Sequence, residues 1–196
     1  MAEITAAELT RFWIDEVGPQ KWYIQDETLD TEIRQRFQAC WQAALDGEKD
    51  AWCDDGPGVL GFLILTDQLP RNMFRGDARS FATDSLARAA AWKAIDRRWD
   101  LMVPEPERQF FYLPLMHSEA LGDQDACIRL MSERMTETGA SNLLHARAHR
   151  EIVRRFGRFP YRNAAFGRMT LPVEQEFLDG EGYAGILRGF QAKAAG

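Results

Sequence analysis

The stretch GPGVLGFLILTDQL, residues 56–69, is the most apolar segment of the 196-residue chain and decides its fold class. Pro57 stands where the first turn of a helix would be, a position at which the missing amide hydrogen costs nothing. A run that is apolar on all sides fits a helix packed at the centre of a domain. A buried strand would have the same composition, but the chain offers no second strand to pair with it. The stretch therefore predicts an all-α protein.

The segments around this stretch also carry the spacing of helices. In residues 29–45, Ile33, Phe37 and Trp41 recur at helical spacing, and Asp30 stands where an N-cap is expected. Connections are short, which favours antiparallel helical hairpins. We predict a single helical domain over residues 1–196, with about eight helices packed as antiparallel hairpins. The predicted core contains Phe62, Leu63, Leu65, Phe81, Trp92, Phe110 and Phe156.

Residues 104–122 are predicted to form one helix, because prolines begin the segment and a glycine ends it. Pro114 lies inside and should kink that helix, since it lacks an amide hydrogen and crowds the carbonyl of Phe110. His117 would follow Phe110 and Leu113 on the stripe that faces the core.

Composition limits the class of protein. The chain has 24 Lys and Arg against 30 Asp and Glu, a net charge of −6, which argues against general nucleic-acid binding. RNA is therefore the least favoured ligand, after the substrate of an enzyme and the ligand of a peptide-binding or anion-binding module. The cysteines Cys40, Cys53 and Cys127 are scattered, as in a reducing compartment, with Cys40 and Cys127 expected in the core. No secretion signal opens the chain, and its longest apolar run is far short of the ~20 residues that span a bilayer. We expect a soluble, cytoplasmic protein with no transmembrane segment.

Three polar islands do not look like ordinary core. In the first, LTDQLPRNMFRGD (residues 65–77), Asp67, Arg71 and Arg75 are four residues apart and would share a helical face. Pro70 favours a break, so an Asp67–Arg71 ion pair that braces a turn explains the pattern equally well. The position of these charges after the most apolar segment supports a functional alternative, because buried charges must be paired or used.

The second island is FFYLPLMHSEALGDQ, residues 110–124, which holds His117, Ser118 and Glu119 in succession. Adjacent helical positions diverge by about 100°, so these three side chains do not make a catalytic triad by themselves. A core histidine with one hydrogen-bonded partner is an equally good interpretation of His117.

The third island is HARAHREIVRRFGRFPYRNAAFGR, residues 145–168. His145 and His149 share a helical face and could both ligate a metal, but the pair lacks the H-E-x-x-H pattern and a third ligand. We therefore expect no metal and no cofactor. After Gly157 a loop should present guanidinium and amide groups that suit a carboxylate or phosphate. A web of arginine–carboxylate bridges that ties loops to helices is the competing interpretation. The loop residues are Arg158, Arg162, Asn163 and Arg168.

Together, the segments at 65–84, 110–130 and 149–170 resemble a bacterial family catalogued as domain of unknown function 924. FWIDEVGPQKWY near the start, LDTEIRQRF and EQEFL near the end extend the resemblance to about residues 9–179. Leu29 and Met169 depart from the family pattern, which has an aromatic and a small polar residue there. The resemblance implies an all-helical fold similar to the tetratricopeptide-like superfamily, and it implies no assured activity.

The resemblance also implies a set of recurrent polar residues. They correspond here to Asp67, Gln68, Arg71, Asn72, Arg75, His117, Ser118, Glu119, Gln124, His149, Arg155, Arg158, Arg162, Asn163 and Arg168.

The first functional hypothesis is a hydrolase for an anionic ester or phosphoester, with a phospholipid-like substrate included. His117 or His149 would be the general base, Ser118 or a water the nucleophile, and Glu119 or Asp67 the group that orients the histidine. The ligand would be held by Arg71, Asn72, Arg75, Gln124, Arg155, Arg158, Arg162, Asn163 and Arg168.

The second hypothesis is a tetratricopeptide-like binding module without catalysis, for an acidic peptide or a small anionic ligand. Geometry separates the two hypotheses. An enzyme needs a histidine within reach of a nucleophile or water in a closed pocket, whereas a peptide binder needs an open groove with its charges spread along it. In both hypotheses we expect several residues from the three islands to meet in one pocket.

Overall fold

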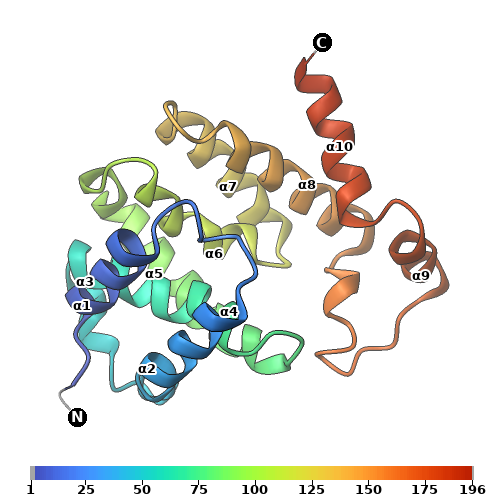
Figure 1. Ribbon diagram of the computed structural model, residues 1–196. Helices are drawn as coiled ribbons and strands as arrows, with labels where there is room; N and C mark the ends of the chain where they lie inside the picture. The colour runs from blue at the N-terminus through green and yellow to red at the C-terminus, as the bar shows by residue number, and fades with distance from the viewer. Residues whose placement is uncertain (1–2, 196) are drawn as a thin grey trace. The chain divides into compact units, whose positions relative to one another are not determined.

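The computed structural model describes residues 3–195, which contain helices and no β-strand (Figure 1). The all-α prediction is confirmed, and the described residues hold eight helical runs of seven residues or more. No described helix is both long and apolar enough to cross a membrane. Internal contacts divide the chain into two compact units, Met1–Pro114 and Leu115–Gly196. The units are described in turn, and the single domain over residues 1–196 stays a prediction.

The first unit is built around the apolar stretch that opened the sequence. There α3 runs directly into a π-helical segment η3 and then α4, and it packs against α1 and α5. A Cβ on Gly61 would lie 2.8 Å from the carbonyl oxygen of Ala6, so only glycine allows α1 to approach α3 this closely. The elements are α1 (Ala6–Arg11), η1 (Phe12–Val17), α2 (Glu27–Leu45), η2 (Asp50–Asp54), α3 (Gly56–Leu63), η3 (Ile64–Gln68), α4 (Leu69–Met73), η4 (Ala78–Phe81), α5 (Asp84–Asp96), η5 (Trp99–Met102) and η6 (Glu107–Phe111).

Pro70 does not break this helical run, contrary to the sequence-based expectation. Proline cannot donate to the carbonyl four residues earlier, which is that of Thr66. Here the chain widens by one residue into η3, and the Leu69 amide donates to the carbonyl of Ile64 instead. The Thr66 carbonyl is buried and accepts the hydroxyl of Thr83 at 2.6 Å, while that hydroxyl accepts the indole N–H of Trp41 at 3.1 Å. The helix therefore passes through the proline because a side chain supplies the missing donor.

Asp30 is not an N-cap, because α2 begins earlier. The cap is Asp26, whose carboxylate accepts the amide hydrogens of Thr28 and Leu29. Asp30 is instead buried within α2 and accepts hydrogen bonds from Asn72 at 2.7 Å and Arg75 at 3.0 Å. A buried carboxylate inside a helix thus joins α2 to α4 and the turn after it.

The predicted core is confirmed for Phe62, Leu63, Leu65 and Phe110, which are all at most 3% exposed. It is wrong for Phe81, Trp92 and Phe156, which are only half-buried. In α5, which packs against α3, the buried face consists mainly of alanines. The buried residues of α5 are Ala87, Ala90, Ala91, Ala94 and Ile95. Cys40 and Cys127 are buried, as expected.

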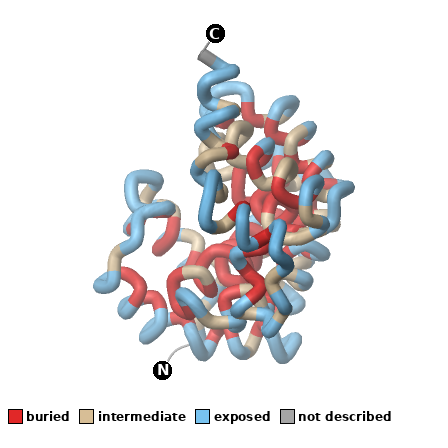
Figure 2. Tube along the Cα trace, turned by 90° about the vertical axis from the view of Figure 1, so that its right-hand side faces the viewer, coloured by how far each residue is buried: buried red, intermediate tan, exposed pale blue. Residues whose placement is uncertain are grey.

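In the second unit, α8 packs against both α7 and α10 (Figure 1). A buried cluster that includes Ile152, Phe159, Phe177 and Ile186 joins α8 to the loop after it and to α9 and α10. The last turns of α10, toward the C-terminus, are exposed (Figure 2). The α7–α8 pair fits the expected hairpin packing, whereas the similarity to tetratricopeptide proteins is not confirmed. The elements are α7 (Leu121–Arg134), α8 (Ala140–Phe156), η7 (Pro160–Arg162), α9 (Pro172–Asp179) and α10 (Gly182–Ala195).

The predicted helix over residues 104–122 is wrong in its extent. The segment contains η6 and a single turn, α6 (Leu113–Met116), and residues 117–120 form a connection to α7. Pro114 sits at the start of α6, where a proline is tolerated, rather than kinking a long helix. His117 consequently lies in a loop and not on a helical stripe.

The Thr66 carbonyl gives the first testable prediction. Replacing Thr83 by Val removes the side-chain donor to that buried carbonyl and also leaves the Trp41 N–H without its acceptor. We expect the free energy of unfolding to fall by about 1–3 kcal/mol, measured by urea denaturation. Thr83→Ser, which keeps the hydroxyl, is the control and should lose much less. A smaller loss in Thr83→Val, which keeps a methyl group, than in Thr83→Ser would show that the methyl group, not the hydrogen bond, stabilises this junction.

Candidate active site

The loop between α6 and α7 carries His117, Ser118 and Glu119, and a buried glutamine fixes its path. The side-chain amide of Gln124, in the first turns of α7, donates to the carbonyls of Met116 at 2.6 Å and Ser118 at 2.7 Å. Its own oxygen is buried and makes no hydrogen bond within residues 3–195. Gln124 therefore shapes the loop, rather than being free to hold a ligand through its amide N–H groups.

Ser118 has its hydroxyl engaged at the beginning of α7. The hydroxyl donates to Asp123 at 2.6 Å and accepts the backbone N–H of Ala120 at 3.1 Å. These two bonds order the turn before α7, whose N-cap is Ala120, and direct the hydroxyl proton toward a carboxylate rather than an imidazole. As placed here, Ser118 is better suited to ordering the loop than to attacking a substrate.

Glu119 joins the loop to the arginine-rich segment. Its carboxylate pairs with both terminal nitrogens of Arg168, at 2.9 and 2.8 Å, and accepts the backbone N–H of Phe159 at 2.9 Å. Partial burial raises the pKa of Glu119. The hydrogen bonds from Arg168 and Phe159 and the charges of Arg168 and Arg162 lower it by more, so that the net pKa lies below its ordinary value. Glu119 is thus a charged anchor, bound to an arginine rather than orienting a histidine through the bonds shown.

The histidines of α8 lie one helical turn apart, as their spacing predicts. The Nδ1–H of His149 donates to the carbonyl of His145 at 2.8 Å, which leaves Nε2 of His149 with its lone pair. The Nδ1 of His145 shares a hydrogen bond of 2.5 Å with the hydroxyl of Tyr183 on α10. Two aromatic rings meet that of His149 edge-on, Tyr183 at 5.0 Å and Phe159 at 5.4 Å between ring centroids.

The loop histidine completes this cluster. The ring of His117 lies 6.2 Å from that of His149, also edge-on, although the two residues are 32 positions apart in the chain. The second and third islands of the sequence are therefore brought together. We call His117, His145, His149, Tyr183 and Arg162 the histidine cluster.

Burial and neighbouring positive charge control the protonation of these groups. Burial lowers the pKa of His149 to about 3, and the charges of His117, Arg162 and His145 add to that effect, against the hydrogen bond to the His145 carbonyl. Burial also lowers the pKa of His145 and raises the pKa of Tyr183 to about 12. At neutral pH His149 and His145 are therefore uncharged, and Tyr183 keeps its proton.

Arg162 brings a buried positive charge to the cluster. It is only 5% exposed, its Nη1 donates to the carbonyl of His117 at 3.0 Å, and its guanidinium lies 4.5 Å from the centre of the Phe159 ring. The short helical segment η7, which begins at Pro160, sets the direction of the Arg162 side chain. The planar guanidinium of Arg162 can bind an oxyanion through two parallel N–H donors.

Arg158 serves a different purpose. It forms a two-pronged ion pair with the buried carboxylate of Glu174, at 2.6 and 2.8 Å, and donates to the carbonyl of Met169. Glu174 also accepts N–H groups from Asn163 and Leu171. Although burial opposes it, the bond from Arg158 together with those from Leu171 and Asn163 lowers the pKa of Glu174 to about 2. This network ties the loop after α8 to the start of α9.

Other arginines of the third island pair with acids in the same way. Arg155 bonds to Glu151 and Glu181, Arg154 bonds to Glu151, and Arg150 bonds to Asp125. For these residues and for Arg158 and Arg168 the structure has the predicted web of arginine–carboxylate bridges. Asn163 is also part of that web, although its side-chain oxygen is buried and accepts no hydrogen bond within residues 3–195.

The first island lies in the first unit, where its charges are held by residues of that unit. Asp67 is buried, accepts the side-chain amide of Gln68 at 2.6 Å and lies 3.5 Å from Arg71. Arg71 also pairs with Asp84 at 3.0 Å. Asn72 and Arg75 bond to Asp30, as described above. That these residues share a pocket with the histidine cluster stays a prediction.

Sequence reasoning missed several members of the site. Tyr183, Phe159 and Asp123 stand in no recognisable pattern, and Glu174 reads locally as an ordinary acid in the first turn of a helix. In the part of the chain that the structure describes, no group of three or more His, Cys, Asp or Glu side chains could hold a metal ion.

Comparison with known proteins places the chain among bacterial proteins without an assigned activity. Residues 9–182 match a family described as bacterial protein of unknown function, DUF924. A solved structure of a protein of unknown function from Agrobacterium tumefaciens is similar, with a TM-score of 0.82 and 41% sequence identity over 89% of this chain and 96% of that one. No curated protein matches the chain.

The lowered pKa of His149 predicts how stability depends on pH. Between the unfolded value of about 6.5 and the folded value of about 3, the unfolded chain binds a proton that the folded chain does not, so stability falls as pH falls. From pH 7 to pH 5 this residue should cost about 2 kcal/mol of unfolding free energy. Urea denaturation at both values should show that His149→Gln removes most of that loss. The same loss in wild type and variant would contradict the assignment.

The Arg158–Glu174 pair yields a prediction about the arginine web. Arg158→Ala leaves the charge of Glu174, which is 1% exposed, without its main partner and should cost about 3 kcal/mol of unfolding free energy. Adding Glu174→Gln should recover part of that loss. Arg154→Ala is the matched control, because its exposed pair with Glu151 should contribute less than about 1 kcal/mol. A loss no greater than that of the control would argue against a structural role for Arg158.

Proposed function

The chain belongs to the bacterial DUF924 family, and we propose that it is a hydrolase of a small anionic ester or phosphoester, acting at the histidine cluster of its second unit. The observation that carries this proposal is the fixed tautomer of His149. Its Nδ1–H is committed to the carbonyl of His145, which leaves the lone pair on Nε2, and the buried guanidinium of Arg162 is near enough for its charge to lower the pKa of the ring. A base oriented by a second group next to a site for negative charge is the arrangement that ester hydrolysis needs.

His149 would act as the general base. Nε2 takes a proton from water while the water oxygen attacks the carbonyl carbon or phosphorus, and the imidazolium then returns that proton to the leaving alcohol. In the free protein the low pKa makes Nε2 a weak base. An anionic substrate close to the ring would raise that pKa toward the working range, because opposite charge favours the protonated form.

Arg162 would hold the anionic group of the substrate. Its buried charge is one of the causes that lower the pKa of His149, so the cluster presents positive potential to a ligand. The His117 carbonyl and the Phe159 ring fix the plane of its guanidinium before any ligand arrives. Pre-set donors stabilise the charge that develops on an oxygen in the transition state.

Water is a better nucleophile candidate than Ser118 in this proposal. The serine hydroxyl donates to Asp123 and orders the beginning of α7. His117, whose ring lies edge-on to that of His149, would make the second contact with the substrate.

A second candidate is a binding function without catalysis, for an acidic peptide or a small anion. The pKa of about 3 for His149 favours it, since a neutral imidazole that stays neutral is a good hydrogen-bond acceptor and a poor base. The two candidates share Arg162 as the anion-holding group and differ in turnover.

The test screens purified protein against generic carboxylic esters, phosphomonoesters, phosphodiesters and phospholipids, beside melting temperatures measured with added phosphate. We expect turnover that falls about 100-fold or more in His149→Gln while phosphate still stabilises that variant. Arg162→Lys should weaken the phosphate effect, because lysine cannot offer two parallel donors. Ser118→Ala is the control for the nucleophile and should keep turnover while it lowers stability.

Each outcome separates the candidates. Phosphate stabilisation without turnover on any substrate class would leave the binding function. Loss of turnover in Ser118→Ala with a normal melting temperature would make the serine the nucleophile. No turnover and no response to phosphate in the wild-type protein would sink both.

A further inference from the structure

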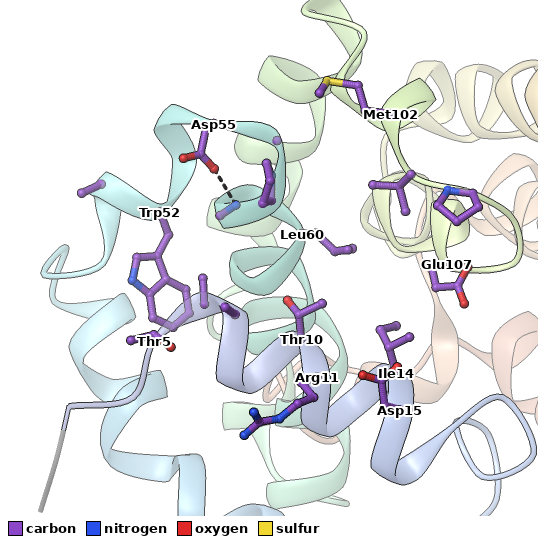
Figure 3. Close-up of a pocket in the computed structure, with 18 residues that line it drawn as sticks. Thr5, Thr10, Arg11, Ile14, Asp15, Trp52, Asp55, Leu60, Met102 and Glu107 are labelled. Carbon is purple, nitrogen blue, oxygen red and sulfur yellow. Dashed lines mark hydrogen bonds between the residues drawn. The ribbon is translucent and has the colours of Figure 1, made fainter.

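A cavity of about 870 Å³ lies within the first unit, and none of the proposed ligand-binding or catalytic residues lines it (Figure 3). It is bounded by α1 and η1 on one side, by η2 and the start of α3 on another, and by the chain from η5 to η6. Thr5 and Trp52 lie at one end, Ile14, Asp15 and Glu107 at the other, and Leu60 between them. Its volume is in the range of pockets that hold small organic molecules.

The walls of this cavity are mainly apolar. Trp52, Ile14, Leu60 and Val103 contribute side chains from four separate elements or connections. Met102 stands at the rim and is 72% exposed. Flexible methionine side chains adapt to apolar ligands of different shape. The cavity is therefore suited to an alkyl or aromatic body.

Two carboxylates at one end of the cavity have no protein partner. Within residues 3–195, neither Asp15 nor Glu107 forms a side-chain hydrogen bond or an ion pair. Asp15 is exposed on η1, and Glu107 is half-buried at the start of η6. Figure 3 shows them on facing elements at the same end.

The remaining charges of the cavity do not neutralise these two. Asp55, a third acid, accepts the backbone N–H of Gly58 at 2.7 Å as the cap of α3. Arg11 is the one basic residue among those that line the cavity. Its Nε lies 3.8 Å from the carboxylate of Glu16, an acid that does not line the cavity. The cavity thus joins apolar walls to a negatively charged end, and a ligand that complements it has an apolar body and a positive head.

We propose that this cavity binds an organic cation, an amine or quaternary ammonium with an alkyl or aromatic body. The body lies against Trp52 and Leu60, and the cation lies between Asp15 and Glu107. An anionic amphiphile would meet two carboxylates without counter-charge, and a neutral one would gain only the apolar contact. This site is independent of the histidine cluster and of the hydrolase proposal.

The test compares three octyl compounds below their micelle concentrations by isothermal titration calorimetry with the full chain. The probes are octyltrimethylammonium, octanol and octyl sulfate. We expect one octyltrimethylammonium per chain, bound at least about tenfold more tightly than octanol, a factor that corresponds to 1.4 kcal/mol. Octyl sulfate should bind more weakly than octanol.

Two variants locate the site. In Asp15→Asn/Glu107→Gln, the preference for the cation over octanol should disappear while octanol binding is kept. Glu27→Gln/Glu48→Gln is the charge-matched control, because both residues are exposed acids of the first unit that do not line the cavity, and it should keep the preference. Ala7→Trp, a change at an exposed position of the lining, should fill the cavity and weaken all three probes with little effect on melting temperature.

The proposal is overturned if the wild-type chain binds none of the probes or binds all three equally. It is also overturned if the double variant keeps the preference for the cation, or if Ala7→Trp binds the cation as the wild type does.

Discussion

The buried carbonyl of Thr66 is the constraint on which the first unit depends. Pro70 removes its normal partner inside the most apolar helical run of the chain, where water cannot substitute. The widened turn η3 carries the helical path past the proline, and the Thr83 hydroxyl donates to the Thr66 carbonyl. Trp41 donates to the same hydroxyl. One backbone carbonyl that lacks its usual helical donor thereby ties α2 and the start of α5 to the α3–η3 run. Asp30, which holds Asn72 and Arg75, adds a second polar tie between α2 and α4.

In the second unit, ion pairs order the loops on which the site is built. An acidic protein with a concentrated group of arginines has carboxylates to neutralise them, and here Glu119, Glu151 and Glu174 do so. Glu174 is the most buried of the three, and it orders the loop through the three residues that bond to it, Arg158, Asn163 and Leu171, rather than through the ion pair alone. The guanidinium of Arg162 is directed at the His117 carbonyl and the Phe159 ring, and its charge also lowers the pKa of Glu119.

The histidine cluster follows from these supports. Three imidazoles, one guanidinium and one phenol are close together, where burial opposes a positive charge on His149 and His145 and the charge of Arg162 adds to that effect at His149. His149 and His145 are neutral as a result, and the Nε2 lone pair of His149 is set by the hydrogen bond that its Nδ1–H makes. An anion entering the cluster would change this balance more than any other ligand, which links the resting electrostatics to the chemistry that we propose.

The sequence by itself determined the helical class, the buried stretch at residues 56–69 and the position of His145 and His149 on one helical face, because helical period and apolar burial are local properties. It also indicated that the arginines either bind an anionic ligand or form bridges to carboxylates, without deciding between these two roles. Only the tertiary structure decided that Pro70 is bridged, that Asp30 is buried, and that His117 lies in a loop beside His149 with Tyr183 across from it. The partners concerned, Thr83, Arg75 and residues of α10, are distant in sequence. A hydrogen bond or ring contact between distant segments leaves no periodic mark on either of them, so packing alone could reveal it.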